Sequence, residues 1–368
     1  MRTVFFIPPL AKATGGLRAI YEMAGLLDAL GHSVSLCAYA PEKTADFAGV
    51  SLPTLLWADA LAGKALGPGD IWCVPESWPN ALAPGVQAGA RALVYVQNWV
   101  FMLTTLPGGV RWSQLPLSCL AVSGPVRDCM ERVFGLTSLG VLPPAVDPAF
   151  FAPREEAAPP RNGKTIRIAW MPRKNRALGL QIQEITRNIL HTRKTAVTPE
   201  FVEIAGKSLP EVAGILRQCH LFLSTGFPEG FALPPLEAMA AGCVPVGFSG
   251  LGGFDYMRNA PMPEYPLFTP CFPLEERPWG GNGFFVADGD ILGAGTALAF
   301  AAQMAATHSE DWQIMLQQGQ TAALAYSQEA RKQRLARLWP DILRHFAENS
   351  TAPATRQSHR QSRNRQPI

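Results

Sequence analysis

The feature that most constrains the fold of this chain is an alternation of short apolar segments with amphipathic ones. It runs through residues 1–147 and starts again at residue 165. The apolar segments are four to seven residues long, and the segments between them carry apolar residues at helical spacing. Strands separated by helices of this length indicate βαβ units, in which parallel strands form a sheet that helices cover. Each run therefore predicts one α/β half.

The pattern predicts the individual elements as well. Strands are expected at 3–8, 33–38, 71–74, 92–96 and 119–122, and in the second run at 165–171, 199–204, 220–224 and 244–248. Helices are expected at 17–30 (after a turn at Gly15-Gly16), 125–134, 178–191, 209–218, 234–241, 293–306 and 311–324. Residues 260–283 are rich in proline and glycine, which predicts an excursion without regular structure.

A change of composition separates the two runs. Residues 142–164 contain six prolines and no sustained periodicity, which is typical of a linker. The expected organisation is a first domain at 1–147, a linker at 148–164, a second domain at 165–325, an amphipathic helix at 326–348 and a disordered basic tail at 349–368.

The formal net charge of +3 is concentrated at the C-terminal end. Residues 349–368 contain four arginines and no acid, so the rest of the chain carries a net charge of −1. A nearly neutral body argues against a surface that binds nucleic acid. The four charges could attract an anionic membrane, at about 1 kcal/mol per charge near its surface, or have no role. A weak peripheral membrane contact therefore stays open.

Neither a membrane span nor a disulfide framework is expected. No segment reaches the roughly 18 to 20 continuous apolar residues that a membrane helix needs, and the first residues do not have the pattern of a signal peptide. The seven cysteines are scattered and include no Cys-x-x-Cys pair, which favours reduced cysteines in a cytoplasmic protein.

The most informative stretch is residues 224–242, with the sequence STGFPEGFALPPLEAMAAG. It follows a predicted strand and opens a predicted helix, which is where open α/β sheets bind ligands. The free amides of 230–233 and the positive end of the helix could face an anion or sugar oxygens. Glu229 and Glu237 could hold two sets of hydroxyls on one elongated ligand. Alternatively, Glu237 only complements the helix dipole and Glu229 is a solvated loop residue.

In its full context, this stretch resembles the Glu-x7-Glu signature of retaining GT-B glycosyltransferases of the family-4, or group 1, type. The resemblance extends over about residues 3–345 and is strongest in 165–255. It implies two Rossmann-like α/β domains that face a cleft, with the C-terminal helix crossing back to the first domain. It also implies that Glu229 contacts the donor sugar, that the backbone of 230–233 binds sugar hydroxyls, and that Glu237 holds the ribose of the nucleotide.

Cations and glycines occur at two further strand ends. Arg173 and Lys174 follow the predicted strand at 165–171, where two cations suit a diphosphate. The resemblance implies that basic residues there neutralise the leaving nucleoside diphosphate, although Arg176 is a third candidate. Gly15 and Gly16 match a Gly-Gly loop that approaches the donor phosphates and the acceptor in that family, and they equally suit an ordinary turn. A Gly-x-Gly-x-x-Gly fingerprint is missing from this turn, which counts against a nicotinamide enzyme.

Two strand ends of the first domain carry polar groups that could meet an acceptor sugar. Glu76 follows the strand at 71–74, and Gln97 and Asn98 follow the strand at 92–96. Many relatives in the family carry a histidine near the latter position, so its absence makes a histidine base from the first domain unexpected. In the second domain, residues 250–256 could close over the nucleotide or form a plain turn.

These expectations define one candidate site. Its predicted catalytic residues are Glu229, Arg173 and Lys174. Its predicted substrate-binding residues are Gly15, Gly16, Glu76, Gln97, Asn98, Thr225, Gly230, Phe231, Ala232, Leu233 and Glu237. No Asp-x-Asp motif beside a predicted strand suggests a metal, so neither a metal nor a cofactor is expected, and the nucleotide sugar is a substrate.

The expected activity is transfer of a hexose-type sugar from a nucleotide-sugar donor to a saccharide or lipid-linked saccharide, in surface polysaccharide or glycoconjugate synthesis. Retention without two carboxylates flanking the anomeric carbon implies front-face attack assisted by the donor, as the resemblance also suggests. Two alternatives stay open: a non-catalytic glycan- or nucleotide-binding subunit of a polysaccharide assembly, and a GT-B-shaped sugar-nucleotide epimerase or hydrolase. The donor sugar, the base and the acceptor are left undetermined.

Overall fold

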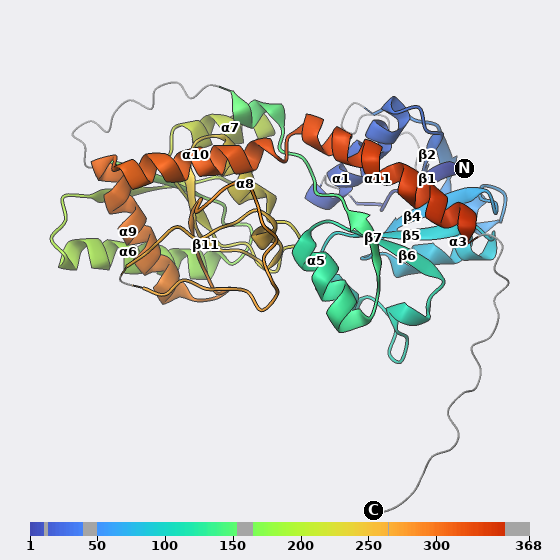
Figure 1. Cartoon of the computed structure of the whole chain (residues 1–368), viewed down its shortest axis with the longest axis horizontal. Helices are drawn as coiled ribbons and strands as arrows, with labels where there is room; N and C mark the ends of the chain where they lie inside the picture. Colours follow the sequence, from blue (N-terminus) through green and yellow to red (C-terminus); the bar gives the residue numbers. More distant parts are fainter. Residues whose placement is uncertain (11–13, 40–49, 153–164, 264, 350–368) are drawn as a thin grey trace, which may run out of the picture.

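A computed structural model describes residues 1–10, 14–39, 50–152, 165–263 and 265–349 of the chain. In these residues the strands form two sheets whose paired strands all run parallel. Figure 1 shows the sheets next to each other along the long axis, each with helices packed against it. Most of the expected linker at 148–164 and nearly all of the expected tail at 349–368 lie outside the described residues.

The first sheet has seven strands in the order β3-β2-β1-β4-β5-β6-β7. They are β1 (Arg2–Phe6), β2 (Val34–Ala38), β3 (Thr54–Leu56), β4 (Asp70–Pro75), β5 (Arg91–Val96), β6 (Leu117–Ala121) and β7 (Ser138–Val141). The helices of this half are α1 (Gly15–Ala29), α2 (Trp57–Leu61), α3 (Leu82–Gln87), α4 (Phe101–Thr104) and α5 (Gly124–Cys129). The central strands are almost wholly buried, as helices on both faces of a parallel sheet require.

The second sheet has five strands in the order β12-β11-β10-β8-β9. They are β8 (Thr165–Trp170), β9 (Thr198–Glu203), β10 (Leu221–Ser224), β11 (Val244–Phe248) and β12 (Phe284–Val286). The helices that follow β8 are α6 (Arg176–Thr192), α7 (Leu209–Arg217), α8 (Leu233–Ala240), α9 (Ile291–Thr307), α10 (Glu310–Leu324) and α11 (Gln328–Glu348). Two parallel α/β halves are thereby confirmed.

The predicted strands are all present, and their ends differ from the prediction by at most two residues. The prediction lacked β3, β7 and β12, which have only three or four residues and are too short to show a period. The turn expected at Gly15-Gly16 was wrong, because α1 already begins at Gly15 and Thr14 caps it by accepting a hydrogen bond from the Leu17 N–H. The helix expected at 125–134 is α5 followed by one π-helical turn, and Gly135 ends it with φ 66°.

Helix α11 returns from the second half to the first, as the resemblance implied, and Figure 1 shows it lying across the first half. Its apolar face is buried at Leu335, Trp339, Ile342 and Phe346. The deepest polar contact is made by Arg331, which is 2% exposed; it forms an ion pair with Glu22 of α1 and donates to the Ala19 carbonyl at 2.9 Å. A buried guanidinium with these partners fixes where α11 lies on α1.

Removing this guanidinium should destabilise the protein strongly. Arg331→Ala leaves the partly buried Glu22 without its partner in α11, and breaking a buried pair costs about 3 to 5 kcal/mol. We expect the free energy of unfolding, measured by urea denaturation, to fall by about 3 kcal/mol. Lys332→Ala, at the exposed neighbouring position, should change it by less than about 0.5 kcal/mol. Equal stabilities of the two variants would contradict a role for Arg331 in docking α11.

None of the helices in the described residues has both the length and the apolar character of a membrane-spanning helix. The longest described helix, α11, has a polar face with several arginines.

Candidate active site

The candidate site lies where the carboxyl ends of β8 and β10 meet the start of α8. These two strands are neighbours in the second sheet, so the segments that leave them run beside each other. A cavity of about 50 Å³ at this edge is lined by Arg173, Lys174, Thr225, Glu229 and Ala232, among others. The structure therefore brings the three predicted catalytic residues to one cavity.

Glu229 and Lys174 form an ion pair in this cavity, with Nζ 2.7 Å from Oε1, and their side chains are 22% and 32% exposed. Lys174 also donates to the Pro228 carbonyl at 3.2 Å. The two segments hold each other in place, because the Asn175 side chain donates to the Thr225 carbonyl at 2.8 Å and the Thr225 hydroxyl donates to the Lys174 carbonyl at 3.2 Å. An ion pair this exposed contributes little to stability, so either partner can turn toward a bound ligand at small cost.

The three cations that follow β8 have different surroundings. Arg173 is exposed, lines the cavity and has no ion-pair partner among the described residues. Arg176 is paired with Glu203 at 2.9 Å and lies over the Trp170 ring at 5.6 Å, and it does not line the cavity. The geometry therefore favours Arg173 and Lys174 over Arg176 for contact with a diphosphate, an alternative that the sequence left open.

The turn before α8 has a backbone conformation that is uncommon for its residue. Ala232 has φ 59° and ψ 60°, in the left-handed region, and its carbonyl accepts a hydrogen bond from the Tyr256 hydroxyl at 2.5 Å. Such conformations often lie at functional sites. Helix α8 begins at Leu233, with prolines in its first turn as expected, and the first N–H groups of a helix have no intrahelical acceptor. Binding of sugar oxygens by the amides of Gly230–Leu233 remains a prediction.

In the first domain, Glu76 holds the loop that follows β5. Its side chain is buried, with 1% exposed, and its two oxygens accept the N–H groups of Gln97 at 2.9 Å and Asn98 at 2.8 Å. Burial raises the pKa of Glu76 to about 7, and these backbone hydrogen bonds oppose that rise. Both carboxyl oxygens of Glu76 are thus occupied by the backbone of the 97–98 loop, and direct contact with a substrate stays a prediction.

The 97–98 loop approaches two of the three glycines of the predicted site, Gly16 and Gly230, closely. A Cβ on Gly16 would lie 2.2 Å from Gln97 Oε1, and a Cβ on Gly230 would lie 1.8 Å from the Gln97 carbonyl oxygen. Asn98 Nδ2 donates across the domains to the Pro228 carbonyl at 3.2 Å. The close approach explains glycine at 16 and 230, whereas an added Cβ at Gly15 would meet open space. Within the described residues, Gln97 Nε2 is buried without a hydrogen-bond partner.

Glu237, on α8, lies close enough to the first domain to feel its charges. Burial raises the pKa of Glu237 to about 7; Arg18 of α1 lowers it, and Asp147 and Glu22 raise it further. Arg18 itself pairs with Glu22 at 2.7 Å and Asp147 at 2.6 Å. The sequence analysis missed Arg18, whose only sequence signal is its place two residues after Gly16 and four before Glu22.

The raised pKa values of Glu76 and Glu237 predict how stability depends on pH. The folded protein keeps both protons up to about pH 7, whereas an unfolded chain loses them near pH 4.5. Between these values the native state binds more protons, so the free energy of unfolding should fall as pH rises from about 5 to 8. One pKa unit corresponds to about 1.4 kcal/mol, so each carboxyl accounts for up to about 3 kcal/mol.

Urea denaturation at intervals between pH 5 and 8 measures this dependence. Glu237→Gln removes one of the two groups and should make the decline clearly shallower, while Glu184→Gln, an exposed substitution on α6, should leave it unchanged. A decline that is equally steep in all three proteins would show that Glu237 does not contribute.

Two aspartates follow β12, a strand that the sequence did not predict. Asp288 accepts the Gly250 N–H at 2.9 Å, and Asp290 caps α9 by accepting the Gly293 N–H at 2.8 Å. Each of these two carboxylates therefore accepts a backbone hydrogen bond within the second domain. The described residues contain no group of three or more histidines, cysteines or acids placed to hold a metal ion.

Comparison with known proteins gives one sequence relative over about half of the chain. An alpha-1,6-glucosyltransferase from Actinobacillus pleuropneumoniae is 33% identical over 184 residues, which are 49% of this chain and 53% of the relative. The chain thus spans about half of the length of the curated relative that it matches. No protein-family profile matches the sequence.

Solved structures match nearly the whole fold at low sequence identity. A glycosyltransferase from Rickettsia africae has a TM-score of 0.63 at 12% identity, over 93% of this chain and 98% of its own. The pneumococcal O-GlcNAc transferase GtfA, in complex with UDP and GlcNAc, has a TM-score of 0.60 at 9% identity, over 94% of this chain and 99% of its own. Together with two parallel α/β halves and a helix that crosses back between them, these matches identify the chain as a protein with the GT-B glycosyltransferase fold.

Proposed function

We propose that the chain is a retaining glycosyltransferase that moves a hexose-type sugar from a nucleotide-sugar donor to a saccharide or lipid-linked saccharide acceptor. The observation that carries the proposal is the cavity in which Arg173, Lys174 and Glu229 meet at the carboxyl ends of β8 and β10. A cleft of this kind, at strand ends in an α/β sheet, is where such folds bind ligands. The partial match to an alpha-1,6-glucosyltransferase supports the sugar-transfer chemistry.

In the proposed mechanism, positively charged residues stabilise the leaving group and a negatively charged residue stabilises the sugar. Departure of the nucleoside diphosphate leaves positive charge on the sugar ring and negative charge on the diphosphate. Arg173 and Lys174 stabilise the diphosphate, and Glu229 orients the sugar and stabilises the ring cation. Such preorganised charges are commonly the largest contribution to catalysis. The acceptor hydroxyl attacks from the face that the diphosphate leaves and gives its proton to the departing diphosphate oxygen as the bond from that oxygen to the anomeric carbon breaks, so the anomeric configuration is retained. Glu237 holds the ribose hydroxyls of the nucleotide.

The domains of this proposal follow the sequence: an acceptor domain at 1–147, a linker at 148–164, a nucleotide-sugar domain at 165–325, the crossing helix at 326–348 and the basic tail at 349–368. Surface polysaccharide or glycoconjugate synthesis is the proposed setting. A cytoplasmic location is also part of the proposal, and its support is that the seven cysteines are scattered along the sequence and include no Cys-x-x-Cys pair.

A panel of donors tests the proposal. UDP-, GDP-, dTDP- and CMP-sugars are screened by thermal shift and then by transfer to oligosaccharide acceptors, starting with UDP-glucose because of the matched glucosyltransferase and the UDP-bound structure. We expect one donor to raise the unfolding temperature and to be turned over with retention. Binding without turnover would favour a non-catalytic binding subunit, and conversion of the donor without transfer would favour an epimerase or a hydrolase. Neither binding nor turnover with any donor would overturn the proposal.

A further inference from the structure

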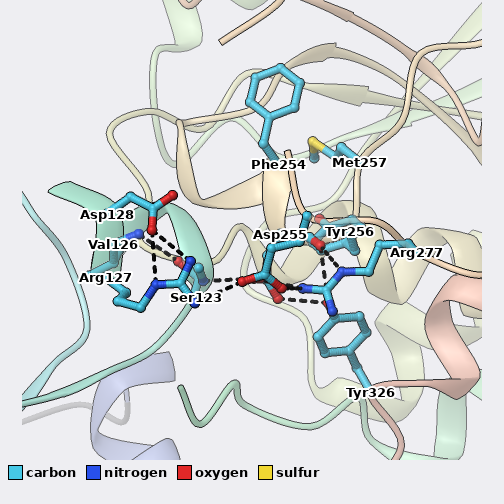
Figure 2. Close-up of polar contacts among 12 residues, drawn as sticks. Ser123, Val126, Arg127, Asp128, Phe254, Asp255, Tyr256, Met257, Arg277 and Tyr326 are labelled. Carbon is cyan, nitrogen blue, oxygen red and sulfur yellow. Dashed lines mark hydrogen bonds and ion pairs between the residues drawn. The ribbon is translucent and has the colours of Figure 1, made fainter. Parts of the chain in front are cut away.

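The start of α5, in the first domain, docks on the second domain beside the candidate site. Figure 2 shows Ser123 and Arg127 on one side of this contact and Asp255 on the other. The Ser123 hydroxyl donates to the Gly230 carbonyl at 2.6 Å, and the Gly124 N–H donates to Asp255 Oδ1 at 2.8 Å. Both hydrogen bonds are buried. At the rim, Arg127 of α5 forms an ion pair with Glu275 of the second domain at 2.9 Å. Three successive contacts thus join the two domains along one helix end.

Asp255 is the centre of this contact and is only 3% exposed. It accepts a hydrogen bond at 2.7 Å from the hydroxyl of Tyr326, which lies between α10 and α11, and pairs with Arg277 of its own domain at 3.3 Å. Its remaining buried partner is the Gly124 N–H, from the other domain. Buried polar groups are costly when they lose a partner. Separating the domains would therefore break the hydrogen bond between Gly124 and Asp255 and the one between Ser123 and Gly230, which favours the closed arrangement.

The segment that carries Asp255 also holds Glu229. The Glu229 N–H donates to the Gly250 carbonyl at 2.9 Å, and the Gly252 N–H donates to the Glu229 carbonyl at 3.1 Å. The next turn, Gly252–Asp255, packs against α5. A Cβ on Gly252 would lie 2.0 Å from the Gly230 carbonyl group, so the two segments are in close backbone contact. A shift of Asp255 is consequently transmitted to the loop of Glu229 and Gly230.

We infer that Asp255 is a positioning residue for the proposed sugar transfer. Its buried carboxylate holds the start of α5 against the Glu229–Gly230 loop and so keeps the two domains in the arrangement that completes the site. The inference rests on the proposed function for its effect on turnover. The domain contact itself stands on the geometry alone, which allows the two to be tested separately.

Two variants break the contact from opposite sides, and one preserves it. Asp255→Ala removes the acceptor. Gly124→Val leaves Asp255 intact but adds a branched side chain at a position where a Cβ would already lie 3.2 Å from Asp255 Oδ1 and 3.1 Å from Glu275 Oε1. Asp255→Asn keeps an acceptor oxygen for the Gly124 N–H. The matched control is Asp128→Ala, because Asp128 pairs with Arg127 in the same helix at 2.7 Å.

The kinetic readout is the division of the effect between kcat and donor KM. We expect Asp255→Ala and Gly124→Val to lower kcat about tenfold or more, since only the closed fraction of molecules turns over. Donor KM should stay within about threefold, because the side chains proposed to hold the diphosphate, the sugar and the ribose all lie in the second domain. Asp255→Asn should restore most of kcat, and Asp128→Ala should leave it unchanged. Equal loss in Asp255→Asn and Asp255→Ala, or a loss confined to KM, would overturn the positioning role.

The structural readout needs no substrate. Small-angle scattering should show a larger radius of gyration for Asp255→Ala and Gly124→Val than for the wild type and Asp128→Ala, at temperatures where circular dichroism shows all four folded. If no donor is turned over, the proposed function fails while this measurement still tests the contact. An unchanged radius of gyration in both disrupting variants would overturn the inference whether or not the wild type is active.

Discussion

Replacing Glu229 by glutamine is expected to lower the turnover number for sugar transfer by about two to three orders of magnitude. Glutamine keeps the shape of the side chain but removes the negative charge, which lies 2.7 Å from Lys174 in the cavity. In the proposed mechanism this negative charge stabilises the positive charge that develops on the sugar ring. An interaction that strengthens in the transition state lowers kcat when it is lost. Steady-state kinetics with the donor found in the panel measures the effect.

Folding and a second carboxylate provide the controls for this experiment. The Lys174–Glu229 pair is partly exposed, so its loss should change the free energy of unfolding by less than about 1 kcal/mol. Glu203→Gln removes the carboxylate that pairs with Arg176 outside the cavity and should keep nearly full turnover. Near-normal transfer by Glu229→Gln would contradict the assignment of Glu229.

Removing Arg173, the cavity-lining arginine that has no ion-pair partner among the described residues, should have the second large effect. Arg173→Ala is expected to lower kcat by about two orders of magnitude, because the leaving diphosphate then lacks one of its two positive partners. The substitution leaves no acid unpaired in the described structure, so the protein should unfold at the same urea concentration as the wild type. The same loss of charge should weaken product inhibition by the nucleoside diphosphate, which gives a second measurement.

Arg176→Ala is the matched control for Arg173→Ala. It removes the same kind of side chain three residues away, from a position where the guanidinium is paired with Glu203 and lies over Trp170. We expect its turnover to stay within about twofold of the wild type, as for a surface change outside the site. Equal losses in the two arginine variants would show that a general positive potential, rather than contact by Arg173, supports the diphosphate.

Much of the fold could be predicted because its signal is local. A strand covered by helices must be apolar along its length, as 92–96 and 244–248 are, and those segments form β5 and β11. β7 could not be found in this way, because it has four residues, includes Gly140 and is only partly buried. The start of α1 was also misplaced. Thr14 caps the helix by accepting a hydrogen bond from the Leu17 N–H, so the helix begins before Leu17 and includes both glycines in its first turn.

The candidate site also contains parts that the sequence could predict and parts that it could not. Glu229, Ala232 and the start of α8 lie within a few residues of one another, so one motif shows them together, and adjacent parallel strands bring Lys174 beside them. Two partners of Asp255, Tyr326 and Gly124, are 71 and 131 residues away in sequence. No local pattern indicates such contacts, and residues 250–256 could therefore be described from sequence only as a closing loop or a plain turn.

The sequence by itself determined that two parallel α/β halves form, and it predicted a sugar- and nucleotide-binding stretch at 224–237, because periodicity and short motifs act within one or two neighbouring elements. Only the tertiary structure decided which cations line the cavity, that Glu76 is occupied by the 97–98 loop, and that α5 closes on Asp255. The first two depend on contacts between neighbouring strand ends within one half, and the third depends on how the two halves pack against each other. That packing is set by shape and by buried hydrogen bonds between residues far apart in the chain.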